Sequence, residues 1–424
     1  MTIIGLNTEM FISSACILHG GKFAASAAEE RLIRRKQTRD FPMKAVEYCL
    51  NHAGIEGKDV EYWAASWNPG AYLAKFNPLL SSKRRHLAEQ LYSVPDHLAE
   101  FYGRQQADRV YQEFDFNGQV MRMHYITHHR AHAANAFLMS PFEEAAILTA
   151  DSQGELESGS LCKGTGKKIE VLETTVYPQS LGVLYSTITD YLGFRPNSDE
   201  WKVMAMGALV EDDVKSCGIE DNLIRVHDDG SFELDLTYFS GFLHDLPHLY
   251  TPKLIELLGP PRKPGEPITE RHSQIAADLQ CIAEEAAAGL LRRLHERTGL
   301  KKLALSGGFF MNSLFNGRVL EISPFEEVYI SSCPDDSGNC FGAALYVHNH
   351  MLGRERIEPV WNTNLGPEFS DEHIEKVLAG FKIPYEKLED PVQAAVEVLE
   401  SGKILGWFQG RMEFGQRALG NRSI

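Results

Sequence analysis

The sequence feature that most constrains this chain is a pattern of strands and turns that occurs twice. Each copy reads strand, polar loop, strand, glycine turn and strand, over residues 2–28 and again over residues 146–175. Asn7 begins the polar loop of the first copy, and Asp151 begins that of the second. Hairpins are common in α/β proteins, but the matched order and similar lengths favour a duplication, which predicts two lobes built alike.

A strand followed by a hairpin in each of two copies resembles the start of actin- and sugar-kinase-like folds. In those folds the loop after the first strand of each lobe approaches phosphate in the cleft between the lobes. We therefore expect an α/β protein with two ribonuclease H-like lobes, at residues 1–144 and 145–355. The pattern then changes to short helices and a strand, which predicts the start of another α/β domain over residues 356–424. Because the chain stops inside a strand-and-turn pattern, we expect that domain to be truncated.

One stretch departs from the alternation of strands and helices. Residues 79–115 are rich in charged and aromatic side chains, so we predict a helical insertion that is broken at Pro95. An insertion of this kind more often forms a lid or an interface than part of a core.

Four residues are candidate ligands for a divalent metal ion. His128 and His132 are four residues apart, which places both imidazoles on one face of a helix. Asp151 and Asp336 each follow a predicted strand of the second lobe, where their carboxylates emerge at the edge of the sheet. Two nitrogens and two carboxylate oxygens suit Fe(II), Mn(II) or Zn(II). The alternative is a pair of surface histidines and two ordinary turn aspartates.

Other residues are typical of nucleotide and phosphate binding. Ser306-Gly307-Gly308 opens a strand-to-helix turn, where backbone N–H groups can approach an anion, although such glycines often serve close packing only. Asn312 either binds a ribose or base or caps the following helix. Arg417 and Arg422 have the forked guanidinium groups that read phosphate, with a charged surface turn as the alternative. Glu200 and Lys202 are either functional or a solvated ion pair.

Several classes of protein are disfavoured. Zinc peptidases with His-x-x-x-His need Glu at the second position, where this chain has His129. The net charge of -16 argues against binding to nucleic acid or to an anionic membrane surface. The seven cysteines include no Cys-x-x-Cys pair, which indicates buried thiols in a reducing compartment. Because we find neither a leader segment nor a long apolar run, we expect a cytoplasmic protein without a membrane span.

Motifs along essentially the whole chain resemble those of one family, and the ordered set is more specific than any single motif. They are His128-His129-x-x-His132-Ala133-Ala134, Asp151-Ser152-x-Gly154, Ser180-Leu181-Gly182-x-Leu184-Tyr185-Ser186, Glu200-x-Lys202-Val203-Met204, Ser306-Gly307-Gly308 with Asn312, Asp336-Ser337-Gly338, and Phe408-x-Gly410-Arg411-x-Glu413-Phe414-Gly415-x-Arg417-Ala418-Leu419-Gly420-Asn421-Arg422-Ser423-Ile424. Together they resemble the O-carbamoyltransferase family of antibiotic, toxin and nodulation-factor biosynthesis, which includes the tobramycin and cephamycin enzymes.

The resemblance implies an ATP-dependent O-carbamoyltransferase with two catalytic centres. A C-terminal domain similar to threonylcarbamoyl-adenylate synthase makes carbamoyl-adenylate from carbamoyl phosphate and ATP with its Mg ion. The actin-like part, similar to the tRNA threonylcarbamoyl-transfer protein, then moves the carbamoyl group to a hydroxyl of a small natural product. It holds an iron-type divalent metal, and Fe(II) is therefore preferred over Mn or Zn.

The resemblance also assigns roles to individual residues. The metal ligands fall on the same four residues that the spacing suggested. Further roles, given by motif position, are catalysis for His129, Asp151 and Lys202, nucleotide binding for Ser306, Gly307, Gly308, Asn312 and Gly338, and the adenylating centre for Arg417 and Arg422.

The chain departs from the family pattern at two places. Phe11-Ile12-Ser13-Ser14 stands where the family usually has His-Asp-Ala-Ser, and Gln416 stands where it usually has Pro. Two other functions therefore stay open: a non-catalytic nucleotide- and metal-binding subunit of a biosynthetic complex, and a threonylcarbamoyl transferase for tRNA, which the acidic charge disfavours. The acceptor, the metal and the oligomeric state, a homodimer included, are left open.

Overall fold

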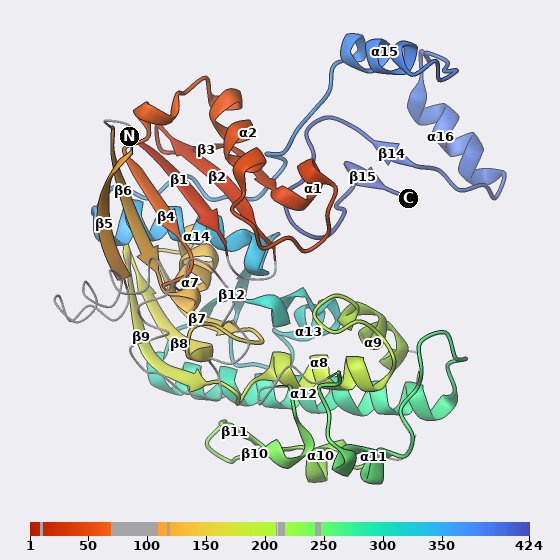
Figure 1. The fold of residues 1–424 in the computed structure, drawn as a ribbon. Helices are drawn as coiled ribbons and strands as arrows, with labels where there is room; N and C mark the ends of the chain where they lie inside the picture. The colour runs from red at the N-terminus through yellow and green to blue at the C-terminus, as the bar shows by residue number, and fades with distance from the viewer. Residues whose placement is uncertain (9–11, 69–108, 117–118, 209, 211–216, 242–246) are drawn as a thin grey trace.

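The structure is a computed structural model that describes residues 1–8, 12–68, 109–116, 119–208, 210, 217–241 and 247–424 (Figure 1). Phe11, where the chain departs from the family pattern, and most of the predicted insertion lie outside these residues. Two mixed β-sheets and the helices packed on them form two lobes, and a C-terminal segment extends from the first lobe.

The first sheet is built around β1, which has antiparallel neighbours on one side and parallel neighbours on the other. Its order is β3-β2-β1-β4-β6-β5. Strands β1, β2 and β3 form an antiparallel meander, whereas β4 and β6 run parallel to β1. The bounds are β1 Thr2–Asn7, β2 Ser14–His19, β3 Lys22–Ala28, β4 Tyr62–Ala65, β5 Arg109–Phe116 and β6 Gln119–Ile126.

The second sheet repeats this plan around β7. Its order is β13-β12-β7-β8-β9, with an antiparallel meander on one side of β7 and two parallel strands on the other. The bounds are β7 Glu144–Ala150, β8 Glu157–Thr165, β9 Lys168–Val176, β12 Lys302–Ser306 and β13 Glu327–Ile330. Because β1 and β7 hold the same place in equivalent sheets, the predicted duplication and the actin/sugar-kinase-like fold class are confirmed.

Two helices lie between the sheets and join the lobes. Helix α7 (His128–Leu138) follows β6, and α14 (Asn339–Leu345) follows β13 in the equivalent position. Almost every residue of both helices is buried, which explains why α7 is rich in alanine on all sides. At Gly342 of α14, an added Cβ would lie 1.9 Å from the carbonyl oxygen of Ala131 in α7. Only glycine allows this contact, so the two helices are held at close range.

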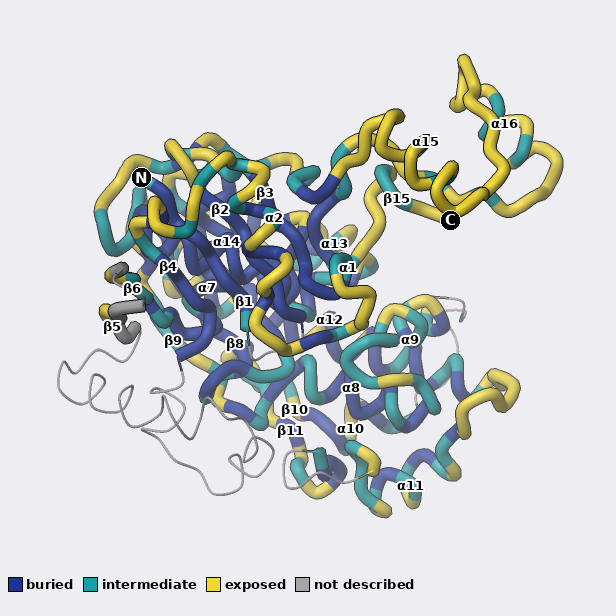
Figure 2. Tube along the Cα trace, turned by 45° about the horizontal axis from the view of Figure 1, so that its top comes forward, coloured by how far each residue is buried: buried dark blue, intermediate teal, exposed yellow. Residues whose placement is uncertain are grey.

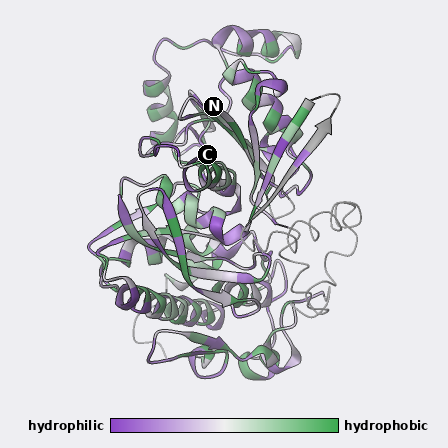
Figure 3. Ribbon diagram, turned by 90° about the vertical axis from the view of Figure 1, so that its left-hand side faces the viewer, coloured by the Kyte–Doolittle hydropathy of each residue, from purple (hydrophilic) through white to green (hydrophobic). Residues whose placement is uncertain are grey.

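Helix α2 covers the outer face of the first sheet and α12 that of the second, and α8, α9 and α10 pack on α12. The longest, α12, turns one apolar face toward the core of the second lobe, and its mixed colouring can be followed in Figure 3. The bounds are α1 Glu29–Ile33, α2 Met43–Ala53, α8 Leu181–Tyr191, α9 Glu200–Gly207, α10 Ile219–Asn222, α11 Pro252–Leu258, α12 Glu270–Thr298 and α13 Ser313–Arg318, with a small hairpin of β10 Ile224–Val226 and β11 Phe232–Leu234. Single helical turns lie at Gly57–Asp59, Leu236–Tyr238, Gly308–Met311, Asp336–Gly338 and Tyr346–Met351.

The C-terminal segment leaves the lobes and then returns to them. Helices α15 (Asp371–Gly380) and α16 (Pro391–Glu400) contain no buried residue and stand away from the lobes in Figure 2. The short strands β14 (Trp407–Phe408) and β15 (Arg422–Ser423) pair with each other and enclose the returning turn, in which Phe414 is buried again. The ring of Phe414 packs on Phe341 of α14, with 4.9 Å between centroids.

The prediction of a helix over residues 79–115 was wrong where the structure describes them. Residues Arg109–Phe116 form β5, which pairs antiparallel with β6 along its whole length. The charge content suggested a helix, but this stretch also contains valine and aromatic residues that favour strands. Pairing with a neighbouring strand decided the outcome, because an edge strand tolerates charged residues.

Candidate metal centre and pocket

The four predicted metal ligands converge at one point between the lobes. His128 and His132 come from the first turns of α7, Asp151 directly follows β7, and Asp336 precedes α14. Their ligand atoms all lie within 4.8 Å of one another, and all four residues are buried. The Nε2 atoms of the two histidines are 3.1 Å apart, and that of His132 is 3.0 Å from Asp151 Oδ2. Asp336 Oδ1 lies 3.4 Å from His128 Nε2 and 3.5 Å from His132 Nε2.

These separations fit a bound cation. A metal held at about 2.1 Å in tetrahedral geometry keeps its ligand atoms about 3.4 Å apart, close to the spacing found here.

The electrostatics of the site also favour a bound positive charge. Burial alone lowers the pKa of His128, but the charges of Asp336 and Asp151 outweigh it and raise that pKa to about 10. Burial raises the pKa of Asp151, but bonds to His128 and His132 hold it well below its usual value.

Neighbouring side chains orient the two imidazoles for this role. Nδ1 of His132 lies 3.0 Å from Ser306 Oγ, which itself donates to the carbonyl of Pro334. An Nδ1–H bond to that hydroxyl leaves Nε2 of His132 free for a metal. Nδ1 of His128 faces the amide of Asn339 at 3.3 Å, and the buried Oδ1 of that amide has no partner. Turning the amide over gives Nδ1–H an acceptor and frees Nε2 of His128 as well.

The start of α7 is anchored by a buried carboxylate. Glu155 accepts hydrogen bonds from the backbone N–H of His128, at 3.0 Å, and of Asn68, at 2.7 Å. A negative charge is favourable at this end of a helix, where backbone donors lack partners. Burial raises the pKa of Glu155 to about 7 despite the nearby charge of His128 and these two donors. Through these hydrogen bonds, Glu155 connects the loop after β7 to the start of α7 and to the segment that follows β4.

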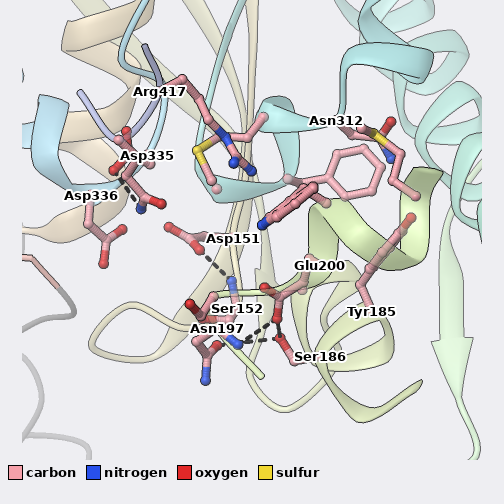
Figure 4. A pocket seen from close by; sticks show the side chains of 18 residues that line it. Asp151, Ser152, Tyr185, Ser186, Asn197, Glu200, Asn312, Asp335, Asp336 and Arg417 are labelled. Carbon is pink, nitrogen blue, oxygen red and sulfur yellow. Dashed lines mark hydrogen bonds between the residues drawn. The ribbon is translucent and has the colours of Figure 1, made fainter. Parts of the chain in front are cut away.

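A pocket that is open to solvent lies beside the candidate metal ligands and measures about 850 Å³ with the open space included. Figure 4 shows it from close by, with Asp335 and Asp336 on one side and Tyr185, Ser186 and Glu200 on another. Apolar and aromatic side chains make up much of the wall. The lining residues are Asp151, Ser152, Gly182, Tyr185, Ser186, Asn197, Ser198, Glu200, Trp201, Met204, Gly308, Phe309, Met311, Asn312, Asp335, Asp336, Gln416 and Arg417.

Glu200 and Lys202 do not form the ion pair that their spacing allowed. The Glu200 carboxylate accepts from Ser186 Oγ at 2.8 Å and from the backbone N–H of Asn197. Burial raises the pKa of Glu200 despite these donors. Lys202 Nζ instead pairs with Asp199, 3.0 Å away, and is not among the residues that line the pocket.

The predicted nucleotide-binding residues divide into two groups. Gly308 and Asn312 line the pocket. Asn312 caps α13 by accepting from the N–H of Phe315, and its contact with a ribose or base stays a prediction. Ser306, Gly307 and Gly338 are not among the residues that line the pocket. Gly307 has a φ of +116°, and a Cβ there would lie 2.0 Å from the carbonyl oxygen of Ala150.

His129 points away from the two histidines beside it. Its Nδ1 lies 2.8 Å from Thr149 Oγ1 and its Nε2 lies 3.2 Å from the carbonyl oxygen of Glu157. Burial holds the pKa of His129 well below its usual range, and the charges of His128 and His132 lower it further. A neutral imidazole with both nitrogens engaged is placed to fix the sheet edge beside the metal ligands.

The two arginines of the C-terminal motif lie in different surroundings. Arg417 lines the pocket, with its guanidinium 5.6 Å from the ring centre of Trp201. Arg422 points back into its own turn and donates to the carbonyl oxygens of Gly415, at 2.6 Å, and of Arg417, at 3.2 Å. It also faces Glu413 at 3.5 Å. Arg417 is thus available to a ligand, whereas Arg422 binds the backbone of the turn that contains Arg417.

Three residues around the site were missed by sequence reasoning. Glu155 and Asn339 are polar residues whose importance depends on where α7 and α14 begin. Asp335 lines the pocket next to Asp336, and the Asp-Asp pair at a strand end was the only signal that could have found it.

The chain matches the family models described as Carbamoyltransferase N-terminus, over residues 2–345, and Carbamoyltransferase C-terminus, over residues 396–424. An uncharacterised Synechocystis protein is 34% identical over the whole chain and 70% of its own length. Nodulation protein NolNO of Sinorhizobium fredii is 33% identical over 99% of this chain. A 3'-hydroxymethylcephem-O-carbamoyltransferase of Streptomyces clavuligerus is 25% identical over 73% of it. The chain spans 58% and 56% of the lengths of these last two relatives.

Solved structures show weaker similarity. HypF of T. kodakarensis has a TM-score of 0.41 and 12% identity, over 83% of this chain and 48% of that one. We draw nothing further from a similarity at this level. Among the described helices, none has the length and apolar character needed to cross a bilayer.

Proposed function

The chain belongs to the carbamoyltransferase family, and we propose that its two lobes transfer a carbamoyl group from carbamoyl-adenylate to a hydroxyl of a small molecule. Carbamoyl-adenylate would form from ATP and carbamoyl phosphate with release of inorganic phosphate and pyrophosphate. The acceptor oxygen would then attack the carbamoyl carbon, the bond from that carbon to the phosphate oxygen of AMP would break, and AMP would leave as the hydroxyl loses its proton. A relative named 3'-hydroxymethylcephem-O-carbamoyltransferase supports a hydroxyl of a small molecule as the acceptor. Within that class, we propose a natural product such as a sugar or polyketide.

The convergence of two imidazoles and two carboxylates at the wall of a pocket is the observation that carries this proposal. His128, His132, Asp151 and Asp336 would hold a divalent cation, for which Fe(II) is our first choice and Mn(II) or Zn(II) the alternatives. When bound, the cation supplies a Lewis acid that offsets phosphate charge and polarises a carbonyl.

The protein residues then have separate tasks. Gly308, Asn312 and the aromatic wall of the pocket would hold the nucleotide, because an apolar surface with a few polar groups suits a base and ribose. Glu200, which accepts a hydrogen bond from Ser186, would offer an acceptor for a hydroxyl group of the ligand at the pocket wall. Closure of the pocket around the donor would limit hydrolysis of a reactive mixed anhydride.

The direct test supplies the chain with carbamoyl-adenylate generated by a separate adenylating enzyme, together with Fe(II) or Mn(II) and a panel of hydroxyl acceptors. Mass spectrometry should detect an acceptor heavier by one carbamoyl group, and AMP should appear in equal amount. Asp336→Asn, which removes one ligand, should lose both products.

The matched control is Asp371→Asn, which alters an exposed aspartate of α15 and should leave both products unchanged. If the chain binds AMP and metal but yields no product with any acceptor, transfer by this chain is rejected. The non-catalytic nucleotide- and metal-binding subunit would then be the better description.

A further inference from the structure

The pocket has a marked imbalance of charge. Asp151, Asp335, Asp336 and Glu200 line it, and Arg417 is the one cationic side chain among the described residues of its wall. A divalent cation at the ligand cluster would offset only part of this negative charge. A ligand that carries a phosphate group therefore needs a further positive partner to enter.

Arg417 has the geometry of such a partner. Its guanidinium faces the ring of Trp201 at 5.6 Å, and it donates no hydrogen bond to another residue that the structure describes. Stacking on an aromatic face leaves the in-plane N–H groups of a guanidinium available, and these form paired bonds with phosphate oxygens. Figure 4 shows the side chain entering the pocket from the C-terminal segment.

The backbone around Arg417 is held in place from both sides. Gln416 Nε2 donates to Asp335 Oδ2 at 3.0 Å, and Arg31 donates to the carbonyl oxygen of Gln416 at 3.2 Å. Arg422 binds the carbonyl oxygen of Arg417 itself. Residues from the first lobe, the second lobe and the C-terminal segment thus fix one turn at the mouth of the pocket.

We propose that the turn of residues 415–422 completes the pocket, with Arg417 binding the phosphate group of the ligand and Arg422 positioning Arg417. The inference rests on the proposed function, because a phosphate-bearing carbamoyl donor is the expected ligand. It moves Arg417 from the adenylating centre, where the family resemblance puts it, to the pocket of the transfer site. The phosphate could belong to a nucleotide or to carbamoyl phosphate, and the experiment separates these sources.

The test measures binding of AMP, adenosine and carbamoyl phosphate to the whole chain by isothermal titration calorimetry. Arg417→Ala should weaken AMP binding by about 10- to 100-fold, which corresponds to the loss of hydrogen bonds to a charged group. Adenosine lacks the phosphate, so its affinity should stay the same. Arg417→Lys should keep part of the AMP affinity, because it retains charge without the fork.

Two further variants separate binding from positioning. Arg292→Ala, at an exposed arginine of α12, is the matched control and should bind all three ligands like the unmodified chain. Arg422→Lys keeps the charge near Glu413 but cannot bridge two carbonyl oxygens. It should weaken AMP binding and again spare adenosine, with an unchanged urea unfolding midpoint.

The proposal would be overturned if Arg417→Ala bound both AMP and carbamoyl phosphate with the affinities of the unmodified chain. Equal losses of AMP and adenosine would also overturn it, because they indicate a stacking role only. Loss of carbamoyl phosphate binding alone would support the residue assignment with that compound as the source of the phosphate. The proposal would also be overturned if the unmodified chain bound neither AMP nor carbamoyl phosphate. Carbamoyl transfer is measured separately. Product formation together with Arg417-independent binding of both AMP and carbamoyl phosphate would reject this inference and keep the proposed function.

Discussion

Replacing Gly342 with alanine tests whether close packing of α7 and α14 sets the metal centre. A Cβ at this position would lie 1.9 Å from the carbonyl oxygen of Ala131, so the helices must separate by about 1.5 Å to restore ordinary contact at 3.4 Å. Overpacking typically costs about 1–3 kcal/mol, and a backbone clash belongs at the upper end of that range. Alanine gains up to about 1 kcal/mol in helix propensity, which leaves a net loss of about 2 kcal/mol.

The same movement should weaken metal binding. Asp336 enters the site from the start of α14, and the two histidines enter from α7, 3.4 and 3.5 Å away. Separating the helices by about 1.5 Å takes Asp336 out of reach of a cation that the histidines hold at about 2.1 Å. We expect the affinity for Mn(II), measured by equilibrium dialysis, to fall by more than about tenfold, as for loss of a ligand.

Gly317→Ala is the matched control. Gly317 lies in α13, is exposed, and has no atom within 4 Å of an added Cβ. That variant should gain about 0.5–1 kcal/mol from helix propensity and bind metal normally. Urea unfolding should therefore separate the two variants by roughly 3 kcal/mol. Equal stability of both variants, with equal metal affinity, would refute the role given to the α7–α14 contact.

Further predictions concern the metal and the pocket. With Mn(II) at about 100 times its Kd, unfolding should cost about 2.7 kcal/mol more than after chelation; a thermal midpoint that chelator leaves unchanged would argue against the site. Asn339→Ala should weaken Mn(II) binding about 10- to 100-fold in dialysis. Asn349→Ala is the control and should leave Mn(II) binding unchanged, because Asn349 is a buried asparagine bonded to the carbonyl oxygen of Arg354. Equal effects of the two substitutions would indicate that both act by destabilising the fold. Burial raises the pKa of Glu200 above its ordinary 4.5, so its contribution to stability is present below pH 4.5 and is lost as pH rises through the raised pKa. In urea unfolding between pH 4 and 8, Glu200→Gln should not show this loss of stability. If the stability of Glu200→Gln and that of the unmodified chain changed in parallel with pH, the prediction would be wrong.

Much of the fold could be predicted because its signals are local. The strand boundaries of the second copy and the spacing of His128 and His132 come from periodicity over a few residues. The two aspartates follow buried strands, and strand ends of one sheet meet at a common edge. These features predict the four candidate metal ligands from the sequence alone. The prediction of a helix at β5 was wrong because it gave more weight to the charged residues than to the strand-favouring ones. Pairing with β6 makes this stretch a strand, and the local sequence does not reveal that pairing.

By itself, the sequence determined the duplicated lobes, the family resemblance and the identity of the residues able to bind a metal. The tertiary structure decided what each of the remaining candidates does. Ser306 faces His132, and His129 faces Thr149. Arg417 and Arg422 turn in different directions, although the sequence motif treats them alike. The physical reason is that a side chain's partners are set by contacts between segments hundreds of residues apart, and local periodicity carries no information about them.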